Sequence, residues 1–242
     1  MKRTAFLAAL GAVAMAVTAC AGTSSAREDL IIAHGSDRRP NQTASDWVTY
    51  ADHVVAVTPT AATELDPGRA ARERGEGLIL RRLELRVDNV LWSRPGVAQP
   101  APRSFPWLAH GWQFTEGDLA HRSKMAGEGA PRMELGHSYI MAIAWEPERC
   151  SPGDHVPAQW RGLGADSTLP YDAGVIGNGE TEGRVQSAAE ALAAAVPDGL
   201  APSLEDQMTG RDANALTTAL TTAQPAVKQE FGPAATSLTA CS

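Results

Sequence analysis

Residues 138–145, Ser138-Tyr139-Ile140-Met141-Ala142-Ile143-Ala144-Trp145, decide the expected fold of this chain. The run is apolar at both odd and even positions, so a strand formed here has no face suited to water. Gly136 comes shortly before it and Pro147 shortly after it, and both are turn residues. The sequence therefore predicts a central strand that is buried on both faces, with the other elements arranged around it.

Two earlier segments predict neighbouring strands. Residues 53–58 are rich in Val, and residues 82–87 alternate charged and apolar side chains, as a half-buried antiparallel strand does. Leu78 and Leu80 lie on the opposite parity from the later apolar residues. We therefore expect a bulge or a change of register near Arg81.

Residues 183–242 differ in character from the chain before them. They are rich in Ala, carry helical patterns over 184–196 and 212–223, and contain Ser203 as the N-cap of a short helix between these two. The predicted fold class is α+β, mainly β with C-terminal helices. We expect an antiparallel, barrel-like sheet within a domain at 45–182, and a helical C-terminal segment packed on it.

Residues 1–20 predict where the protein is located. Two basic residues precede an apolar run over 5–17, which is the pattern of a secretory signal peptide at residues 1–19 and is short for a transmembrane span. Val17-Thr18-Ala19-Cys20 resembles the lipobox of bacterial lipoproteins. This resemblance implies that a diacylglyceryl group is attached to the sulfur of Cys20 and that the chain is cut before it. An ordinary cleaved signal peptide and an uncleaved membrane helix are the alternatives.

The lipobox resemblance implies an extracytoplasmic protein held at the cell membrane, because two acyl chains form a stable anchor. Residues 20–44 are mostly small and polar, and they predict a flexible tether between the anchor and the domain. Only 3 of the 21 basic residues are Lys, and Ala is abundant. This bias is typical of a GC-rich genome, such as that of an actinobacterium.

The chain contains three cysteines. With Cys20 assigned to the lipid, Cys150 and Cys241 are the pair left to form a disulfide in an oxidising compartment. The bond would close a loop of about 90 residues, for which the chain-entropy model gives about 4–5 kcal/mol of stabilisation. Two free thiols are the alternative.

The chain is acidic, and its charge limits the expected partners. The formal net charge is −7, and it becomes −9 when residues 1–19 leave with Lys2 and Arg3. Basic residues scattered over an acidic chain argue against nucleic acid as a partner. We expect contact with the membrane through the lipid on Cys20, and with a cell-wall glycan or an envelope protein.

Residues 45–150 resemble bacterial domains of the netrin-like group. The resemblance rests on Ala51-Asp52 before a Val-rich strand, on Asp88-Asn89-Val90-Leu91-Trp92 at the end of a charged strand, on a Pro-rich stretch, and on Leu135-Gly136-His137-Ser138-Tyr139-Ile140. It implies a five-stranded OB-type barrel related in fold to the tissue inhibitors of metalloproteinases. The N-terminal cysteine wedge of the vertebrate inhibitors is absent from this stretch, so inhibition of proteases is not implied.

The sequence offers little evidence of catalysis. Neither Gly-x-Ser-x-Gly nor Ser-x-x-Lys occurs, and pairing of Cys150 would remove it as a nucleophile. The nearest set of metal ligands is His110, Asp118 and His121, without a helical His-x-x-x-His to support it. We predict no catalytic residue and no cofactor. A hydrolase or a metal-dependent enzyme that uses these three residues is the enzymatic alternative.

Six tryptophans against four phenylalanines is an unusual ratio. A Trp side chain has a broad apolar face that stacks on sugar rings or peptides when it is exposed, whereas a buried one fills the core. Trp107 and Trp112 lie beside Pro106 and Gly111, and Tyr171 lies in a Gly-rich stretch, so these three are the candidate ligand-binding residues. The expected function is a non-enzymatic binding or interaction module of the cell envelope. A structural envelope protein is the other alternative.

Overall fold

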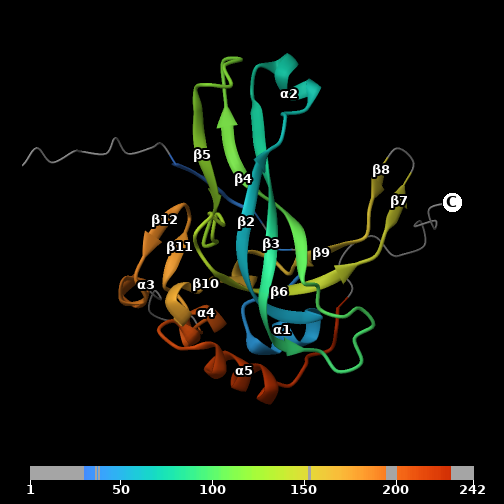
Figure 1. Cartoon of the computed structure of the whole chain (residues 1–242), viewed down its shortest axis with the longest axis vertical. Coiled ribbons are helices and arrows are strands. Elements are labelled where there is room, and N and C mark those ends of the chain that lie inside the picture. The colour runs from blue at the N-terminus through green and yellow to red at the C-terminus, as the bar shows by residue number, and fades with distance from the viewer. Residues whose placement is uncertain (1–29, 36, 38, 152–153, 195–200, 230–242) are drawn as a thin grey trace, which may run out of the picture.

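The computed structural model describes residues 30–35, 37, 39–151, 154–194 and 201–229, and it is mainly β (Figure 1). The strands are β1 (Leu30–Ala33), β2 (His53–Glu64), β3 (Gly77–Ser93), β4 (Ser104–Phe114), β5 (Arg122–Gly127), β6 (Tyr139–Glu146), β7 (Arg149–Ser151), β8 (Asp154–Val156), β9 (Gln159–Gly162), β10 (Thr168–Pro170), β11 (Gly179–Thr181) and β12 (Arg184–Gln186). The helices are α1 (Ala44–Tyr50), α2 (Arg69–Arg74), α3 (Ala188–Ala194), α4 (Leu204–Met208) and α5 (Ala213–Thr222), with short 3₁₀ turns η1 (Ala165–Ser167) and η2 (Asp172–Gly174).

The predicted central strand is confirmed as β6. Its side chains from Tyr139 to Ala144 are buried, and it pairs with β2 along one edge and with β9 and β10 along the other. The odd residues of this stretch join one hydrophobic cluster and the even residues join another. Each face of β6 therefore meets its own core, which explains why both parities are apolar.

The sheet is mixed, and the predicted antiparallel barrel is not formed in the described part of the chain. Its strand order is β1-β5-β4-β3-β2-β6-β10, and the terminal strands β1 and β10 do not pair with each other. β1 runs parallel to β5, whereas the other pairs of this sheet are antiparallel. In Figure 1, β2 and β3 extend from the region of α1 and α5 to α2 at the other end of the molecule.

The described part of the predicted tether belongs to the folded domain. Leu30 of β1 faces Lys124 of β5 in the parallel register, and Asn41 is buried with its carbonyl accepting the indole N–H of Trp47 at 2.7 Å. Thr43 then caps α1 in a capping box with Asp46. The described residues between 30 and 44 thus pack on the domain, and the apolar β1 completes an edge of the sheet. Residues 20–29 lie outside the described residues.

The irregularity expected near Arg81 is present as a bulge in the neighbouring strand β4. Ile79 pairs with Trp112 and Arg81 pairs with Ala109, so β4 has one more residue than β3 between these pairs. A Cβ atom on Gly111 would lie 2.1 Å from the carbonyl oxygen of Ile79. Only glycine fits there without moving the strands.

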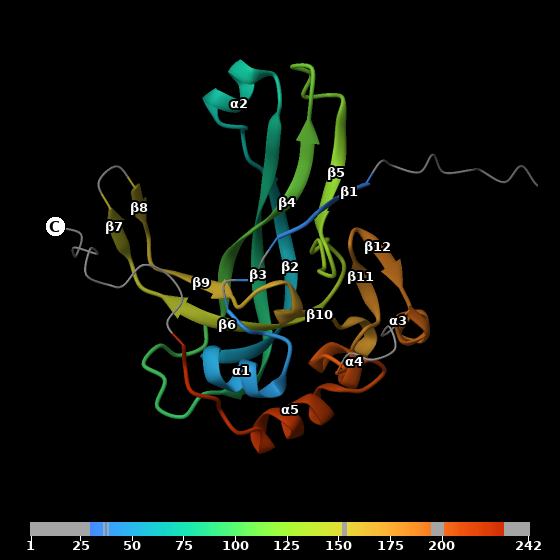
Figure 2. The same cartoon turned by 180° about the vertical axis from the view of Figure 1, so that it is seen from behind.

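Helices α1, α4 and α5 cover one face of β2 and β6 (Figure 2). The three predicted C-terminal helices are present: α3 begins at Ala188, Ser203 and Asp206 form a capping box on α4, and Asp212 caps α5. The chain from 184 begins instead as β12, which pairs with β11, so the predicted domain boundary at 182/183 divides a hairpin. None of the described helices is both long and apolar enough to cross a membrane.

Glu205 on α4 has an unusually high pKa for a carboxyl group. Burial first, and then the nearby Asp166 and Asp206, raise its pKa from 4.5 to about 7. Between these two values the folded chain holds a proton that the unfolded chain has released. The free energy of unfolding therefore falls as the pH rises through this window, by up to about 3 kcal/mol.

We expect Glu205→Gln to remove this decrease. The difference in the free energy of unfolding between the variant and the wild type should rise in favour of the variant from pH 5 to pH 8. The reason is that the neutral amide needs no proton to remain buried. Urea unfolding at both pH values measures the change. Glu73→Gln on the exposed helix α2 is the control and should show no such gain; equal pH dependence of Glu205→Gln and the wild type would contradict the prediction.

Candidate functional site

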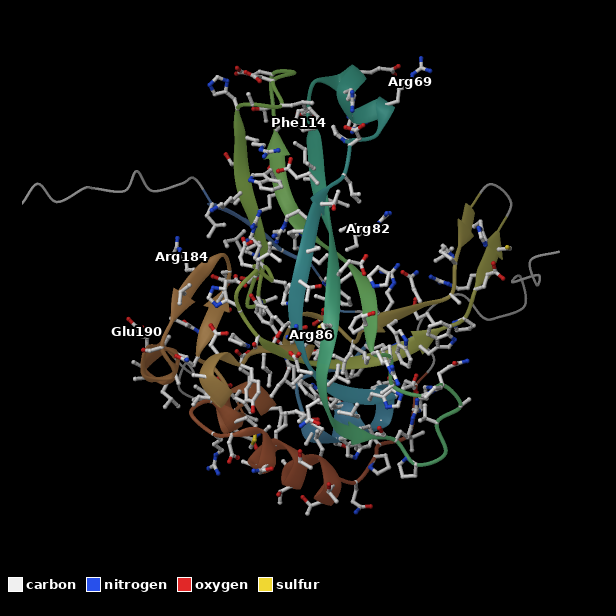
Figure 3. The ribbon with its side chains drawn as sticks, in the orientation of Figure 1. Arg69, Arg82, Arg86, Phe114, Arg184 and Glu190 are labelled. Atoms are coloured by element: carbon white, nitrogen blue, oxygen red, sulfur yellow. The ribbon has the colours of Figure 1, made fainter. Side chains whose placement is uncertain are left out.

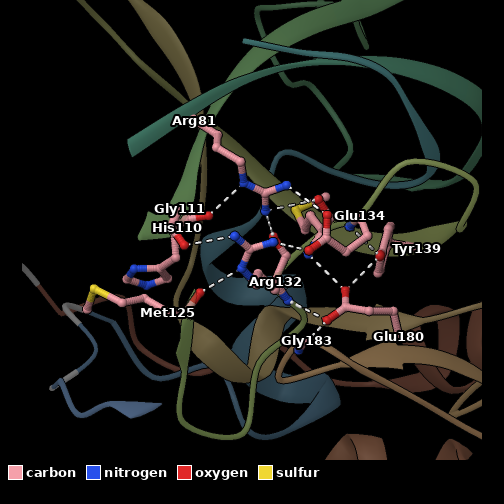
Figure 4. A network of polar contacts seen from close by, with 10 residues as sticks. Arg81, His110, Gly111, Met125, Arg132, Glu134, Tyr139, Glu180 and Gly183 are labelled. Atoms are coloured by element: carbon pink, nitrogen blue, oxygen red, sulfur yellow. Dashed lines mark hydrogen bonds and ion pairs between the residues drawn. The ribbon is translucent and has the colours of Figure 1, made fainter. Parts of the chain in front are cut away.

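Two buried arginines stabilise the bulge in β4 (Figure 4). Arg81 Nε donates to the carbonyl oxygen of His110 and Arg132 Nη2 donates to that of Gly111, both at 2.8 Å. Glu134 accepts from Arg81 Nη1 at 2.9 Å and also pairs with Arg132. Burial lowers the pKa of Arg81, while Glu134 opposes this effect. The bulge thus supplies one acceptor to each guanidinium group, and the carbonyl oxygens of Arg132 and Met125 supply further ones to Arg81 and Arg132, respectively.

Glu180 of β11 holds the loop that carries Arg132 and Glu134. Its carboxylate is almost fully buried and accepts the backbone N–H groups of Arg132, Met133 and Gly183 at 3.0, 2.9 and 2.6 Å. It also accepts the hydroxyl of Tyr139 at 2.7 Å. Burial, and then the charge of Glu180, raise the pKa of Tyr139 far above its usual range. We call five residues the arginine network: Arg81, Arg132, Glu134, Tyr139 and Glu180. Their polar groups pair with one another and with nearby backbone groups, so the network acts as a framework.

A hollow of about 370 Å³ lies beside this framework, and we call it the Trp107 hollow. Its lining residues come from the end of β1 and the segment after it, β4, the end of β5, and the chain around β9: Ala33, His34, Gly35, Asp37, Trp107, His110, Gly127, Glu128, Ala130, Arg161, Gly162, Gly164 and Ala165. Trp107 is half-buried, and a Cβ atom on Gly162 would lie 3.0 Å from its ring. Glycine therefore allows β9 to pack closely against the indole.

The polar groups of the hollow differ in how they are paired. His34 Nδ1 lies 2.7 Å from a carboxylate oxygen of Glu128. Asp37 accepts the Asn41 amide at 2.9 Å and the backbone N–H of Ala165 at 2.8 Å.

His110 is the unpaired group of the hollow. Its buried Nδ1 has no hydrogen-bond partner among the described residues. Burial, and then Arg132 and Arg81, lower the pKa of His110, so its imidazole is neutral at pH 7. The hollow thus combines one aromatic face with a neutral imidazole and several charged groups.

The structure does not bring the three candidate ligand-binding residues together. Trp112 lines a separate pocket of about 400 Å³, where the guanidinium carbons of Arg122 and Arg132 lie 4.0 and 5.1 Å from its ring centroid. Its π system already contacts cations of the chain itself. Tyr171 packs against the helix-side core and lines neither hollow. Trp107 is thus the candidate whose surroundings best suit a ligand.

The candidate metal ligands are also separated. Asp118 and His121 pair at 2.6 Å in the exposed connection between β4 and β5, whereas His110 lies beside the arginine network. No three His, Cys, Asp or Glu side chains in the described residues are grouped so that they could hold a metal ion. Cys150 lies in β7, and Cys20 and Cys241 lie outside the described residues, so lipidation and the disulfide stay predictions.

Sequence reasoning missed Arg161, His34 and the arginine network. Arg81 did carry a signal, because it shares the parity of the buried residues Leu83 and Leu85. Arg161 and His34 lie in short segments without a pattern, and only the tertiary fold brings them to Trp107. Comparison of the chain with protein-family models, curated proteins and solved structures found no match.

The arginine network predicts a large effect of Glu180→Gln. The amide nitrogen would face backbone N–H donors, and two buried arginines would lose a nearby negative charge. We expect a loss of about 3–5 kcal/mol in the free energy of unfolding, measured by urea denaturation. Glu182→Gln is the matched control, because Glu182 accepts one backbone N–H from Gly129 on the surface. A loss below about 1 kcal/mol for both variants would refute a framework role for Glu180.

Proposed function

We propose that this protein is a non-enzymatic binding module of the cell envelope, and that the Trp107 hollow receives a sugar ring of a cell-wall glycan. The observation that carries the proposal is the half-buried indole in a hollow whose other walls present imidazole, guanidinium and carboxylate groups. Small-molecule sites commonly combine apolar or aromatic surface with a few placed polar groups.

The chemistry of a sugar ring matches these walls. One face of a pyranose exposes C–H groups that stack on an indole, while the ring edge carries hydroxyls that both donate and accept hydrogen bonds. Arg161 supplies donors and Glu128 supplies acceptors. Neutral His110 can do either, depending on its tautomer. Glycines in the lining leave room for the ligand to approach the backbone.

Titration calorimetry with N-acetylated chitohexaose, which we call chitohexaose, and with peptidoglycan fragments tests this proposal. Trp107→Ala should weaken binding at least about tenfold, because the stacking surface is lost. Trp92→Ala is the matched control: this indole is also half-buried, but it packs against the helix-side core cluster. The proposal fails if chitohexaose and the fragments do not bind, or if the two variants bind equally well.

We further propose that the domain is lipid-anchored outside the cytoplasm through Cys20, with Cys150 and Cys241 joined. The lipobox-like residues 17–20 support the anchor, and the oxidising compartment that it implies supports the disulfide. Cys20→Ser should move the protein from the membrane fraction to the soluble fraction, because the thioether that carries the lipid cannot form. Retention of the variant in the membrane at the wild-type level would exclude the anchor.

An OB-type relationship is the finer proposal for the fold. Its support is the order of β2, β3, β4 and β5 as successive neighbours, with β6 returning beside β2. The relationship concerns ancestry and carries no inhibitory activity with it.

A further inference from the structure

Three arginines converge on one carboxylate at the end of β6. Arg39 Nη2 lies 3.5 Å from Oε1 of Glu146, and Arg149 Nη2 and Arg161 Nε each lie 3.6 Å from Oε2. We call these three residues the arginine triad. Charge-assisted N–H···O bonds between arginine and carboxylate are typically about 2.7–2.9 Å long. All three contacts are longer, so Glu146 neutralises the triad only loosely.

The triad carries more positive charge than Glu146 alone can balance. Three guanidinium groups share this one carboxylate, in a chain whose net charge is −7. The neighbouring Arg94 does not change this balance, because it is paired with Asp52.

Hydrogen bonding in the triad is also incomplete. The buried Arg149 Nε has no hydrogen-bond partner, and neither has the buried Oε2 of Glu146, among the described residues. The three arginine side chains are 30%, 32% and 46% exposed, so a ligand can reach them. The triad therefore has accessible positive charge.

Arg161 connects the triad to the Trp107 hollow, because it lines the hollow and also contacts Glu146. The two carboxylates of the hollow already have partners: Asp37 accepts from Asn41 and Ala165, and Glu128 lies within hydrogen-bond distance of His34. A negative group on a ligand in the hollow would thus be attracted to the side of Arg161, where the positive charge of the triad is not fully neutralised.

We propose that the glycan bound at Trp107 is acidic and that its carboxylate, as in a uronic acid, binds to the arginine triad. This inference rests on the proposed function, since Trp107 is the site of the ring. Guanidinium groups pair with carboxylates in a planar, two-pronged geometry, so a ligand carboxylate can form short contacts to the exposed parts of these groups while their long contacts to Glu146 remain.

Two hexasaccharides that differ in charge provide the test. Hyaluronan hexasaccharide alternates three N-acetylglucosamine units with three glucuronic acid units, which carry carboxylates. Chitohexaose in its N-acetylated form has six N-acetylglucosamine units and is neutral. At low salt we expect the wild type to bind hyaluronan at least tenfold more tightly than chitohexaose. The difference should shrink at 0.5 M NaCl, because salt screens exposed charges.

The double variant Arg39→Gln/Arg149→Gln should lose the preference for hyaluronan and keep its affinity for chitohexaose within twofold. Arg82→Gln/Arg86→Gln is the matched control, since both arginines lie on the exposed face of β3 (Figure 3). It removes the same charge from the protein and should keep the preference. The salt dependence of the wild type tests the inference even if the triad variant does not fold.

The outcomes separate the two proposals. Equal affinity for both sugars, with Trp107→Ala weakening both, overturns the acidic ligand and keeps the proposed function. Hyaluronan binding that depends on the triad but not on Trp107 supports the anion site and overturns the stacking site. Absence of binding to either sugar overturns both.

Discussion

The extra residue in β4 is the constraint on which this structure depends. It turns the carbonyl groups of His110 and Gly111 toward the interior, where Arg81 and Arg132 donate to them. A buried guanidinium without acceptors is very unfavourable, so the bulge and the two arginines require each other. Glu134 and Glu180 then balance the charge and tie in the loop before β6 and the β11–β12 hairpin. The Trp107 hollow lies against this framework and takes its shape from it.

The parts of the fold that follow from local pattern could be predicted. The apolar run at 138–145 gave the central strand, the alternation after Arg82 gave the exposed and buried faces of β3, and Ser203 and Asp212 gave two helix starts. In each case the information lies within about ten residues. The openness of the sheet could not be predicted, because closure depends on which edges meet, and the parallel pairing of β1 with β5 joins segments that are distant in sequence.

The candidate site was predictable only in part. Trp107 could be singled out as an aromatic residue beside proline, but the same reasoning selected Trp112, whose ring faces two arginines. What separates them is the set of neighbours that the fold supplies. Arg161 and His34 reach the hollow from β9 and from the chain after β1, and Glu146 gathers arginines from three segments. These residues are brought together only by the tertiary fold, so no local sequence pattern reveals them.

The position of β1 limits how far the domain could stand from a membrane. Nine residues lie between Cys20 and Leu30, and a fully extended chain from one to the other spans at most roughly 35 Å. The chain enters β1 at Leu30, and Ala33 and His34 at the other end of this strand line the Trp107 hollow. A lipid on Cys20 would thus hold the strand that leads into the hollow, and it would keep the hollow close to the bilayer.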